Sequence, residues 1–490
     1  MGGNPKSLDD LVVRLRAAVG SDQVITDRQQ LRTYECDGLA HYKVTPAVVV
    51  LPHSTGQVAS VVRACIEAEV PYVARGSGTG LSGGALPHAD GVLVVTSQMR
   101  TILEVDATDQ RAVVQPGVIN LHVTRAAAPD GYYYAPDPSS QLVCSIGGNV
   151  AENSGGAHCL KYGFTTNHVM GVEMVAPDGT VVRLGGRAPD PPGYDLMGAF
   201  VGSEGTLGIA TEVTVRLMRA PETVRTLLAA FPSTDEAGGA VSAVIGAGVL
   251  PAAIEMMDAL AIEAAEAAVQ CGYPAGAGAV LIVELDGAAA DVEAQFGEVE
   301  RHCRDNGATE IRIAADDAER ALFWKGRKSA FAAVGRISPD YIVQDGVIPR
   351  TALPEVLRRI ASLSGSGGVR VANVFHAGDG NLHPLVLFDD AVPGQAEEAE
   401  TISGAILDLC IEYGGSITGE HGVGMDKAKY MSRMYNDDDL DTMQMLRCAF
   451  DPHNLCNPGK IFPTPRLCGE VPGRHKGQHP LQEAGLAEVF

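Results

Sequence analysis

The stretch Arg75-Gly76-Ser77-Gly78-Thr79-Gly80-Leu81-Ser82-Gly83-Gly84 decides the expected fold of the first part of this chain. Residues 72–75 lead into it as a short apolar strand, and residues 46–52 form an earlier buried strand. Between them, residues 55–69 repeat apolar side chains at helical spacing, and Pro71 ends the helix. This order predicts the start of a βαβ unit whose second strand runs into the glycine-rich loop.

The composition of the glycine-rich loop indicates how it would bind a phosphate. Gly78-x-Gly80-x-x-Gly83 matches the dinucleotide fingerprint, yet Gly84-Ala85-Leu86-Pro87 prevents the helix that this fingerprint requires. The loop also lacks a Gly-Lys-Ser/Thr sequence, which excludes a P-loop. We therefore expect a non-helical loop whose successive backbone N–H groups bind an anion.

Two further regions rich in glycine and serine follow, one at residues 136–156 and one at 201–209. A set of turns without any ligand is the simpler alternative. Glycines cost chain entropy on folding, however, and a close approach of backbone to ligand would explain so many of them. Three such regions fit a cofactor much longer than one phosphate group.

The second informative stretch is Val374-Phe375-His376-Ala377-Gly378-Asp379-Gly380-Asn381-Leu382-His383. A second segment with acidic and imidazole side chains, Gly419-Glu420-His421-Gly422, follows later in the chain. Two histidines bracket a Gly-Asp-Gly-Asn turn, so two short strands could direct both imidazoles to one point. The carboxylate of Glu420 would complete a three-ligand site for a divalent metal, zinc first, with manganese or iron as alternatives. His421 would stay free to transfer protons. A tight turn alone would also account for Asp379 and Asn381.

Composition excludes several classes of protein. A net charge of −23 leaves little room for the broad basic surface that nucleic acid requires. The ten cysteines form no C-x-x-C pair, which argues against an iron–sulfur run or a zinc ribbon and favours a reduced, cytoplasmic protein. No apolar signal core follows Met1, and the uncharged stretch 237–254, broken by Pro251, reads as a packed helix and loop rather than a membrane span.

At 490 residues the chain is longer than one hydrophobic core usually accommodates, so more than one domain is expected. Further strands are expected at 92–96, 102–106, 111–115 and 207–217, with a hairpin at 170–184. Beyond residue 220, helices rich in Ala and Glu alternate with strands at 280–285 and 310–313, and later helices occupy about 395–413 and the region up to 449. We expect an α+β protein with domains at 1–220 and 221–410, a C-terminal segment at 411–465 and a tail at 466–490.

These motifs, in this order, resemble a known family. Ala74–Gly80, Gly147-Gly148-Asn149, Tyr162-Gly163 and Gly202–Gly208 are similar to the FAD-binding domain of the vanillyl-alcohol-oxidase/PCMH flavoproteins. His376–His383, Gly419–Gly424 and Asn457-Pro458-Gly459-Lys460 resemble the D-2-hydroxyacid dehydrogenase branch, which includes glycolate oxidase catalytic subunits and D-lactate dehydrogenases. The resemblance covers residues 40–465. It implies a PCMH-type FAD-binding domain of two subdomains, a mixed α/β cap that binds substrate, and a C-terminal helical segment.

The resemblance also implies which residues hold the cofactor. Some relatives attach the flavin to a loop histidine, but residues 75–84 contain none, so FAD is expected to bind non-covalently; His88 lies just outside the loop. The expected FAD-binding residues are Arg75, Gly76, Ser77, Gly78, Thr79, Gly80, Leu81, Ser82, Pro138, Ser139, Ser145, Gly147, Gly148, Asn149, Asn153, Gly155, Gly156, Tyr162, Gly163, Glu204, Gly208, Ile209 and Asn457.

By the same resemblance, the chain is an FAD-dependent oxidoreductase of 2-hydroxy acids, with glycolate or D-lactate as the expected substrate. Arg327 would bind the substrate carboxylate, because its planar guanidinium matches a carboxylate with two hydrogen bonds. His421 would be the general base, and His376, His383 and Glu420 would bind the metal. Phe331 and Val343 occupy positions where some relatives have further substrate contacts, which leaves the substrate open.

Two other functions remain as alternatives. A metal-dependent hydrolase would use the same His, His and Glu but give no role to the glycine-rich regions. A non-catalytic flavin-binding subunit of an oxidase complex would not need the catalytic set. Because no cysteine cluster provides an internal relay, electrons must leave to an external acceptor: a quinone, an iron–sulfur subunit, an electron-transfer flavoprotein or oxygen. The chain would form a homodimer or a hetero-complex and would contact a membrane only through a partner.

Overall fold

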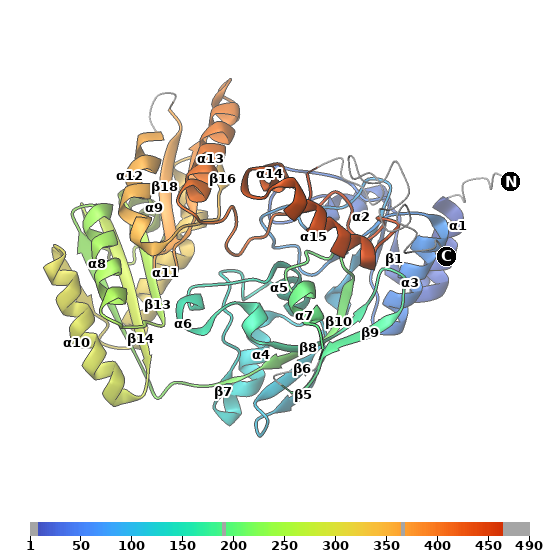
Figure 1. Cartoon of the computed structure of the whole chain (residues 1–490), viewed down its shortest axis with the longest axis horizontal. Coiled ribbons are helices and arrows are strands. Elements are labelled where there is room, and N and C mark those ends of the chain that lie inside the picture. The colour runs from blue at the N-terminus through green and yellow to red at the C-terminus, as the bar shows by residue number, and fades with distance from the viewer. Residues whose placement is uncertain (1–7, 189–192, 364–367, 464–490) are drawn as a thin grey trace, which may run out of the picture.

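The structure is a computed structural model, and it describes residues 8–188, 193–363 and 368–463. The expected tail at 466–490 lies outside these residues. Two smaller sheets and a two-stranded pair are built from the described residues before 220, and one large sheet is built from those after it (Figure 1). The change from one to the other falls between β11 (Met218–Arg219) and β12 (Thr223–Phe231).

The first sheet contains the expected βαβ unit. Its order is β1 (Val24–Ile25), β2 (Val48–Val50), β4 (Val92–Val95) and β3 (Tyr72–Arg75), and both β2 and β3 run parallel to β4. Helix α3 (Thr55–Ala68) joins β2 to β3. It begins at Ser54, whose hydroxyl accepts a hydrogen bond from the backbone N–H of Gln57, and it ends at Glu69 in a left-handed conformation. Its buried side packs on the sheet together with α1 (Leu8–Val19).

The second sheet is antiparallel and continues the same half of the molecule. Its order is β5 (Ile102–Asp106), β6 (Arg111–Val114), β10 (Ile209–Arg216), β8 (Val169–Val175) and β9 (Val181–Gly185). The predicted hairpin is therefore present, with Gly179 at a φ of 79° in its turn. Three short helices lie in the connections between its strands: α5 (Ile146–Glu152), α6 (Cys159–Tyr162) and α7 (Leu196–Phe200). Helix α5 was not predicted from the sequence, where its residues were assigned to a glycine-rich loop.

The large sheet forms the cap. Its strands include β12, β13 (Ala253–Asp258), β14 (Ala279–Gly287), β15 (Glu310–Ile313), β16 (Asp340–Val343), β17 (Gly346–Val347), β18 (Arg370–His376), β19 (Asn381–Leu382) and β20 (Pro384–Phe388). Side chains alternate along β12: Leu227, Ala229 and Phe231 enter one core, and Leu228 and Ala230 enter the other. This alternation requires helices on both faces of the sheet.

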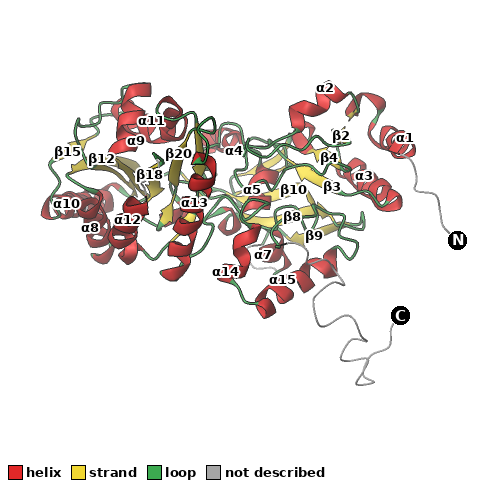
Figure 2. Ribbon diagram, turned by 90° about the horizontal axis from the view of Figure 1, so that it is seen from above, coloured by secondary structure: helices red, strands yellow, loops and turns green. Residues whose placement is uncertain are grey.

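Helices do cover both faces of the cap sheet (Figure 2). One layer consists of α8 (Thr234–Gly246), α10 (Ala289–Asp305), α12 (Leu353–Leu363) and α13 (Gln395–Glu412). The opposite layer consists of α9 (Ala259–Val269) and α11 (Asp317–Ala333). No helix within the described residues is both long and apolar enough to cross a bilayer.

The chain ends by returning from the cap to the first sheet. After α14 (Met431–Met434) and α15 (Asp437–Phe450), the backbone N–H of Asn457 donates to Tyr72 O, and that of Tyr72 donates to Leu455 O. The C-terminal segment therefore lies against β3, the strand that enters the glycine-rich loop. Cysteines 36, 65, 144, 159, 271, 303, 410 and 456 are free thiols.

Candidate active site

A cavity of about 1330 Å³ lies between the two halves of the molecule. One wall carries the glycine-rich loop and the start of α5, and the other carries His383, Glu420 and His421. This volume exceeds that of an ordinary small-ligand pocket, which is roughly 300–1,000 Å³. The cavity is therefore large enough for a long cofactor and a small substrate together.

The glycine-rich loop and α5 meet at Ser145. Its hydroxyl accepts a hydrogen bond from the backbone N–H of Gly148 and so caps α5. Any side chain on Gly76 would collide with that hydroxyl, so glycine is required where the two segments touch. Gly78 has a φ of 70°, a left-handed conformation that also favours glycine. The loop and the start of α5 thus line the same part of the cavity. The backbone N–H groups of Ile146, Gly147 and Gly148 already donate to Val118, Pro116 and Ser145, so an anion here would be bound by N–H groups of the loop.

Most of the residues expected to bind FAD line this cavity. They are Arg75, Gly76, Ser77, Gly78, Thr79, Gly80, Leu81, Pro138, Ser139, Ser145, Gly147, Gly148, Asn149, Gly155, Glu204, Gly208 and Ile209. The structure does not place Ser82, Asn153, Gly156, Tyr162, Gly163 or Asn457 on the lining.

Several of the residues off the lining brace the walls instead. The side-chain amide of Asn457 donates to the carbonyl oxygens of Gly84, at 2.9 Å, and Glu204, at 2.6 Å. The carbonyl of Ser82 accepts hydrogen bonds from the backbone N–H groups of Met425 and Asp426. The hydroxyl of Tyr162 donates to Asp286 in the cap. These residues support the cavity without facing it.

His376, His383 and Glu420 come together as expected. The Nε2 atoms of both histidines lie 3.3 Å from Glu420 Oε1, and the three potential ligand atoms lie within 4.8 Å of one another. Glu420 Oε2 is buried without a hydrogen-bond partner among the described residues. Burial alone would raise the pKa of Glu420, but the three nearby histidines outweigh it and lower that pKa to about 2. A charged carboxylate with one free oxygen beside two imidazoles suits a divalent metal.

His376 is oriented from behind by Glu255. The two residues are register partners on β18 and β13, and His376 Nδ1 lies 2.7 Å from Glu255 Oε1, which leaves Nε2 facing Glu420. Such a carboxylate behind an imidazole is the usual support of a metal-binding histidine. Burial would lower the pKa of His376, but Glu255 and Glu420 raise it well above the ordinary value. The role of Glu255 was not predicted from the sequence, because this residue lies in a strand, β13, that carries no recognisable motif.

Arg327 lies behind the wall rather than on it. Its side chain is 3% exposed, and Nη2 lies 2.6 Å from Glu255 Oε2. Nε and Nη2 nevertheless lack properly oriented hydrogen-bond acceptors among the described residues. The neighbouring Lys328 and Phe331, by contrast, line the cavity, as does Val343. Arg327 thus has unused donors, but this structure keeps them off the cavity surface.

His421 lines the cavity and stacks on His383, with ring centroids 4.9 Å apart and an interplanar angle of 2°. Its Nε2 lies 4.0 Å from Glu420 Oε1. Burial lowers the pKa of His421 to about 4, because nearby His383 and Lys427 add to the effect and Asp345 only partly opposes it. His421 is therefore neutral at physiological pH and able to accept a proton.

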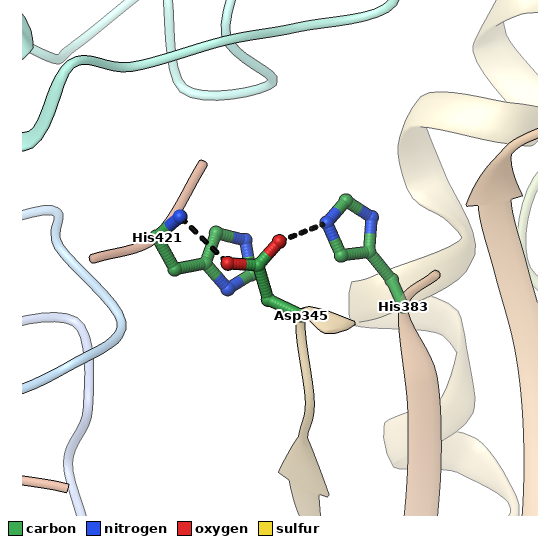
Figure 3. A group of neighbouring side chains, drawn as sticks. All are labelled: Asp345, His383 and His421. Carbon is green, nitrogen blue, oxygen red and sulfur yellow. Dashed lines mark hydrogen bonds and ion pairs between the residues drawn. The ribbon is translucent and has the colours of Figure 1, made fainter. Parts of the chain in front are cut away.

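A second carboxylate that was not predicted from the sequence, Asp345, contacts both stacked histidines, one through the ring of His383 and the other through the backbone of His421 (Figure 3). Its Oδ1 lies 3.3 Å from His383 Nε2, and its Oδ2 accepts a hydrogen bond from the backbone N–H of His421 at 2.8 Å. Burial would raise the pKa of Asp345, but His421, Lys427 and His383 lower it well below the ordinary value. Asp345, His383 and His421 form a second group close enough to hold a metal. No sequence motif marks Asp345.

Two carboxyl groups lie together in the wall beside Gly422. Glu204 accepts hydrogen bonds from the backbone N–H groups of Val423, at 2.7 Å, and Gly424, at 2.6 Å. Burial raises the pKa of Glu204 to about 7 despite these donors, and burial together with Glu204 raises the pKa of Glu152 well above its ordinary value. Burial and repulsion between the two carboxyl groups therefore both favour the protonated form of Glu152. It lines the cavity but was not among the expected residues.

Comparison with known proteins places the two halves in described families. Residues 46–185 match an FAD binding domain, and residues 220–461 match the C-terminal domain of FAD linked oxidases. The chain is 50% identical to the glycolate oxidase subunit GlcD of Escherichia coli K12, over 95% of this chain and 93% of that protein. It is 40% identical to the Bacillus subtilis subunit of the same name, covering 88% and 92%. The mitochondrial D-lactate dehydrogenase [cytochrome] of Arabidopsis thaliana is 30% identical, covering 86% and 74%.

Solved structures share the fold. A p-cresol methylhydroxylase with substrate bound superposes with a TM-score of 0.77 at 17% identity, covering 92% of this chain and 96% of the other. A 4-ethylphenol oxidase from Gulosibacter chungangensis gives 0.76 at 18% identity, covering 94% and 99%. The expected fold class, a PCMH-type FAD-binding half with a mixed α/β cap, is confirmed.

Proposed function

The chain belongs to the FAD-linked oxidases and is an FAD-dependent oxidoreductase of 2-hydroxy acids, and on that premise we propose that its substrate is glycolate or D-lactate. One observation carries the proposal: His383, Glu420 and His421 share a cavity with the glycine-rich loop, on the opposite wall. A small hydroxy acid held at the histidines would then lie next to the cofactor. A metal-dependent hydrolase is set aside, because it leaves the FAD-binding domain without a role.

Two events remove hydrogen from the substrate. Bound FAD supplies the chemistry for one of them, since it accepts the hydride from the α-carbon. His421 performs the other by taking the hydroxyl proton at Nε2, the nitrogen that faces Glu420. The pKa of His421, about 4, leaves the imidazole unprotonated at neutral pH, and binding of the substrate must raise that pKa for the ring to be an effective base. The products are the 2-oxo acid, reduced cofactor and protonated His421.

Other residues hold and orient the substrate. His376, His383 and Glu420 would bind a divalent metal, zinc first, which would supply an electrophile for the hydroxyl and carboxylate oxygens. The unpartnered Glu420 Oε2 and the carboxylate behind His376 support this assignment. We assign the substrate carboxylate to Arg327, whose Nε and Nη2 have donors to offer. That role requires its guanidinium to turn from Glu255 toward the cavity.

Electrons leave the reduced cofactor for a partner. The relatives of highest identity named here carry the word subunit in their names, which supports a hetero-complex with an external acceptor. Neither of the two possible metal-binding groups found among the described residues contains cysteine, so neither could serve as an internal iron–sulfur relay. The acceptor is a quinone, an iron–sulfur subunit, an electron-transfer flavoprotein or oxygen.

An anaerobic substrate panel tests the proposal. Glycolate or D-lactate is expected to bleach the flavin of the purified protein, whereas L-lactate is not. His421→Ala is expected to retain FAD and to slow this reduction by about 10²- to 10⁴-fold, the usual contribution of a general base. His122→Ala, on an exposed part of α4 (Asn120–Ala127), is the control. Normal reduction of the His421→Ala flavin would contradict the assignment of the base.

A further inference from the structure

Asp345 is a fully buried carboxylate that the proposed mechanism does not use. It lies between β16 and β17 in the cap, and its side chain has 0% exposure. Its Oδ2 accepts hydrogen bonds from the successive backbone N–H groups of Gly419 at 3.0 Å, Glu420 at 3.1 Å and His421 at 2.8 Å. The hydroxyl of Thr418 donates to the same oxygen at 2.6 Å, and Lys427 Nζ lies 3.4 Å away.

These contacts matter because the segment 418–422 belongs to no helix or strand. Its N–H groups therefore have no partners from regular secondary structure, and a buried N–H without a partner is costly. Asp345 supplies one anionic acceptor for three of them. A charged acceptor makes each such hydrogen bond stronger than a neutral one would.

The same contacts argue against Asp345 as a metal ligand. Its Oδ2 already accepts from Thr418, from three backbone N–H groups and from Lys427. Its Oδ1, the oxygen 3.3 Å from His383 Nε2, also accepts from the backbone N–H of Glu420 at 3.3 Å, so the group formed with His383 and His421 offers less free capacity. Glu420 Oε2, in contrast, is buried without a partner among the described residues. Of the two groups that could hold a metal, the one containing Glu420 is the better candidate. Asp345 therefore has a different role in the site.

Neighbouring atoms leave the segment little room to move. A side chain on Gly419 would come within 2.6 Å of the Asn381 amide, in β19, the strand that precedes His383. Gly422 has a φ of 84° and abuts Glu152 and Glu204. The segment is therefore confined at both ends, and Asp345 fixes its middle. A shift of the backbone here would move Glu420 and His421 relative to His383.

The geometry points to Asp345 as the positioning residue that holds the Glu420–His421 backbone so that both side chains face the cavity. Asp345 acts through this segment and does not touch the substrate. The inference rests on the proposed roles of Glu420 and His421, but the backbone contacts can be tested without any substrate.

Hydrogen exchange of the holoenzyme provides that test. The peptide covering 418–422 is expected to be protected in the wild type and to exchange at least about 10-fold faster in Asp345→Asn, because the amide is uncharged and presents an NH₂ group. Asp258→Asn is the control: this partly buried cap carboxylate accepts hydrogen bonds from the backbone N–H groups of Ala261 and Asn373 but lies off the cavity lining. It should leave the exchange of 418–422 unchanged. The inference would be overturned if the peptide were unprotected in the wild type, or if it were equally protected in Asp345→Asn. The wild-type measurement does not depend on how well the variant folds.

Anaerobic flavin reduction gives the second readout. Asp345→Asn is expected to keep FAD and to reduce at least about 100-fold more slowly, whereas Asp258→Asn should reduce at a near-normal rate. Added to His421→Ala, Asp345→Asn should cause almost no further loss, because residues that act as one unit are not additive. Full additivity, or a normal rate in Asp345→Asn, would overturn the positioning role. If no 2-hydroxy acid reduces the wild type, the proposed function fails, and the exchange experiment still decides the backbone contacts.

Discussion

Glu420 is where the metal assignment can be decided at the level of a single residue. Its carboxylate faces two imidazoles, its second oxygen has no partner among the described residues, and its pKa of about 2 keeps it charged throughout the physiological range. A metal would satisfy all three conditions at once. Without a metal, the same charge would have to be balanced by protonated His376, whose pKa Glu255 and Glu420 raise.

We therefore predict that Glu420→Gln lowers bound metal at least about 10-fold while FAD stays bound. The amide has the shape of the carboxylate but not its charge, and zinc affinity depends on anionic and imidazole ligands. Elemental analysis against flavin absorbance measures both. Glu298→Gln, on the exposed side of α10, is the control. Equal metal content in wild type and Glu420→Gln would remove Glu420 from the ligand set.

The sequence was informative for residues that lie near one another in the chain or in a motif. His376 and His383 are joined by one short turn, and Glu420 is adjacent to His421, so their meeting could be predicted from the pattern. The presence of Glu255 and Asp345 at the site could not be predicted in this way. They reach the site from 121 residues before His376 and 76 residues before His421, respectively, through strand pairing that no local pattern specifies.

At the scale of elements, the βαβ unit and the hairpin were predicted because their apolar spacing and turn residues agree. Helix α5 was missed because Gly147 and Gly148 lower its helix propensity. It forms nevertheless, since Ser145 caps it and Ile146 and Val150 are buried in the core of the second sheet. Tertiary packing here overrides local preference.

The contact between the glycine-rich loop and the start of α5 leads to a prediction about cofactor binding. Gly76→Ala would push the new methyl group into the Ser145 hydroxyl and disturb both the loop and the cap of α5. We expect FAD occupancy after purification to fall several-fold and the lost cap to cost about 1 kcal/mol. The flavin-to-protein absorbance ratio and thermal unfolding measure the two effects.

The control for that experiment is Gly56→Ala in α3, where an added methyl group meets no atom within 4 Å. It should keep FAD and should slightly stabilise the helix, by up to about 1 kcal/mol. If Gly76→Ala retained full occupancy, the loop would not approach the cofactor as closely as the cavity lining suggests.

At the scale of the whole molecule, His158 joins the two halves. It lies between α5 and α6, and its ring nitrogens lie 2.8 Å from Asp137 and 3.2 Å from Glu284 of the cap strand β14. Arg320 and the Trp324 indole N–H also bind Glu284. Nearby, Lys161 and Tyr162 contact Asp286 of the same strand. The cavity walls are thus held together by charges that surround one histidine.

This arrangement gives the stability of the molecule a defined pH dependence. Burial alone would lower the pKa of His158, but Asp137 and Glu284 outweigh it and raise the pKa to about 10. A raised pKa means that the folded state binds the proton more tightly than the unfolded state, whose pKa is about 6.5. The stabilisation is therefore complete below pH 6.5 and is lost as the pH rises through about 10.

We predict that His158→Gln lowers the apparent Tm at pH 6 by a few degrees, corresponding to roughly 1–3 kcal/mol, and that its difference from wild type shrinks steadily toward pH 10. Glutamine keeps a polar side chain but cannot carry the charge, so only the wild type loses stability across this range. Thermal unfolding of the FAD-loaded proteins at a series of pH values measures the difference, with the exposed His53→Gln as control. A difference that stays constant with pH, or that widens at alkaline pH, would show that charge on His158 does not hold the two halves together.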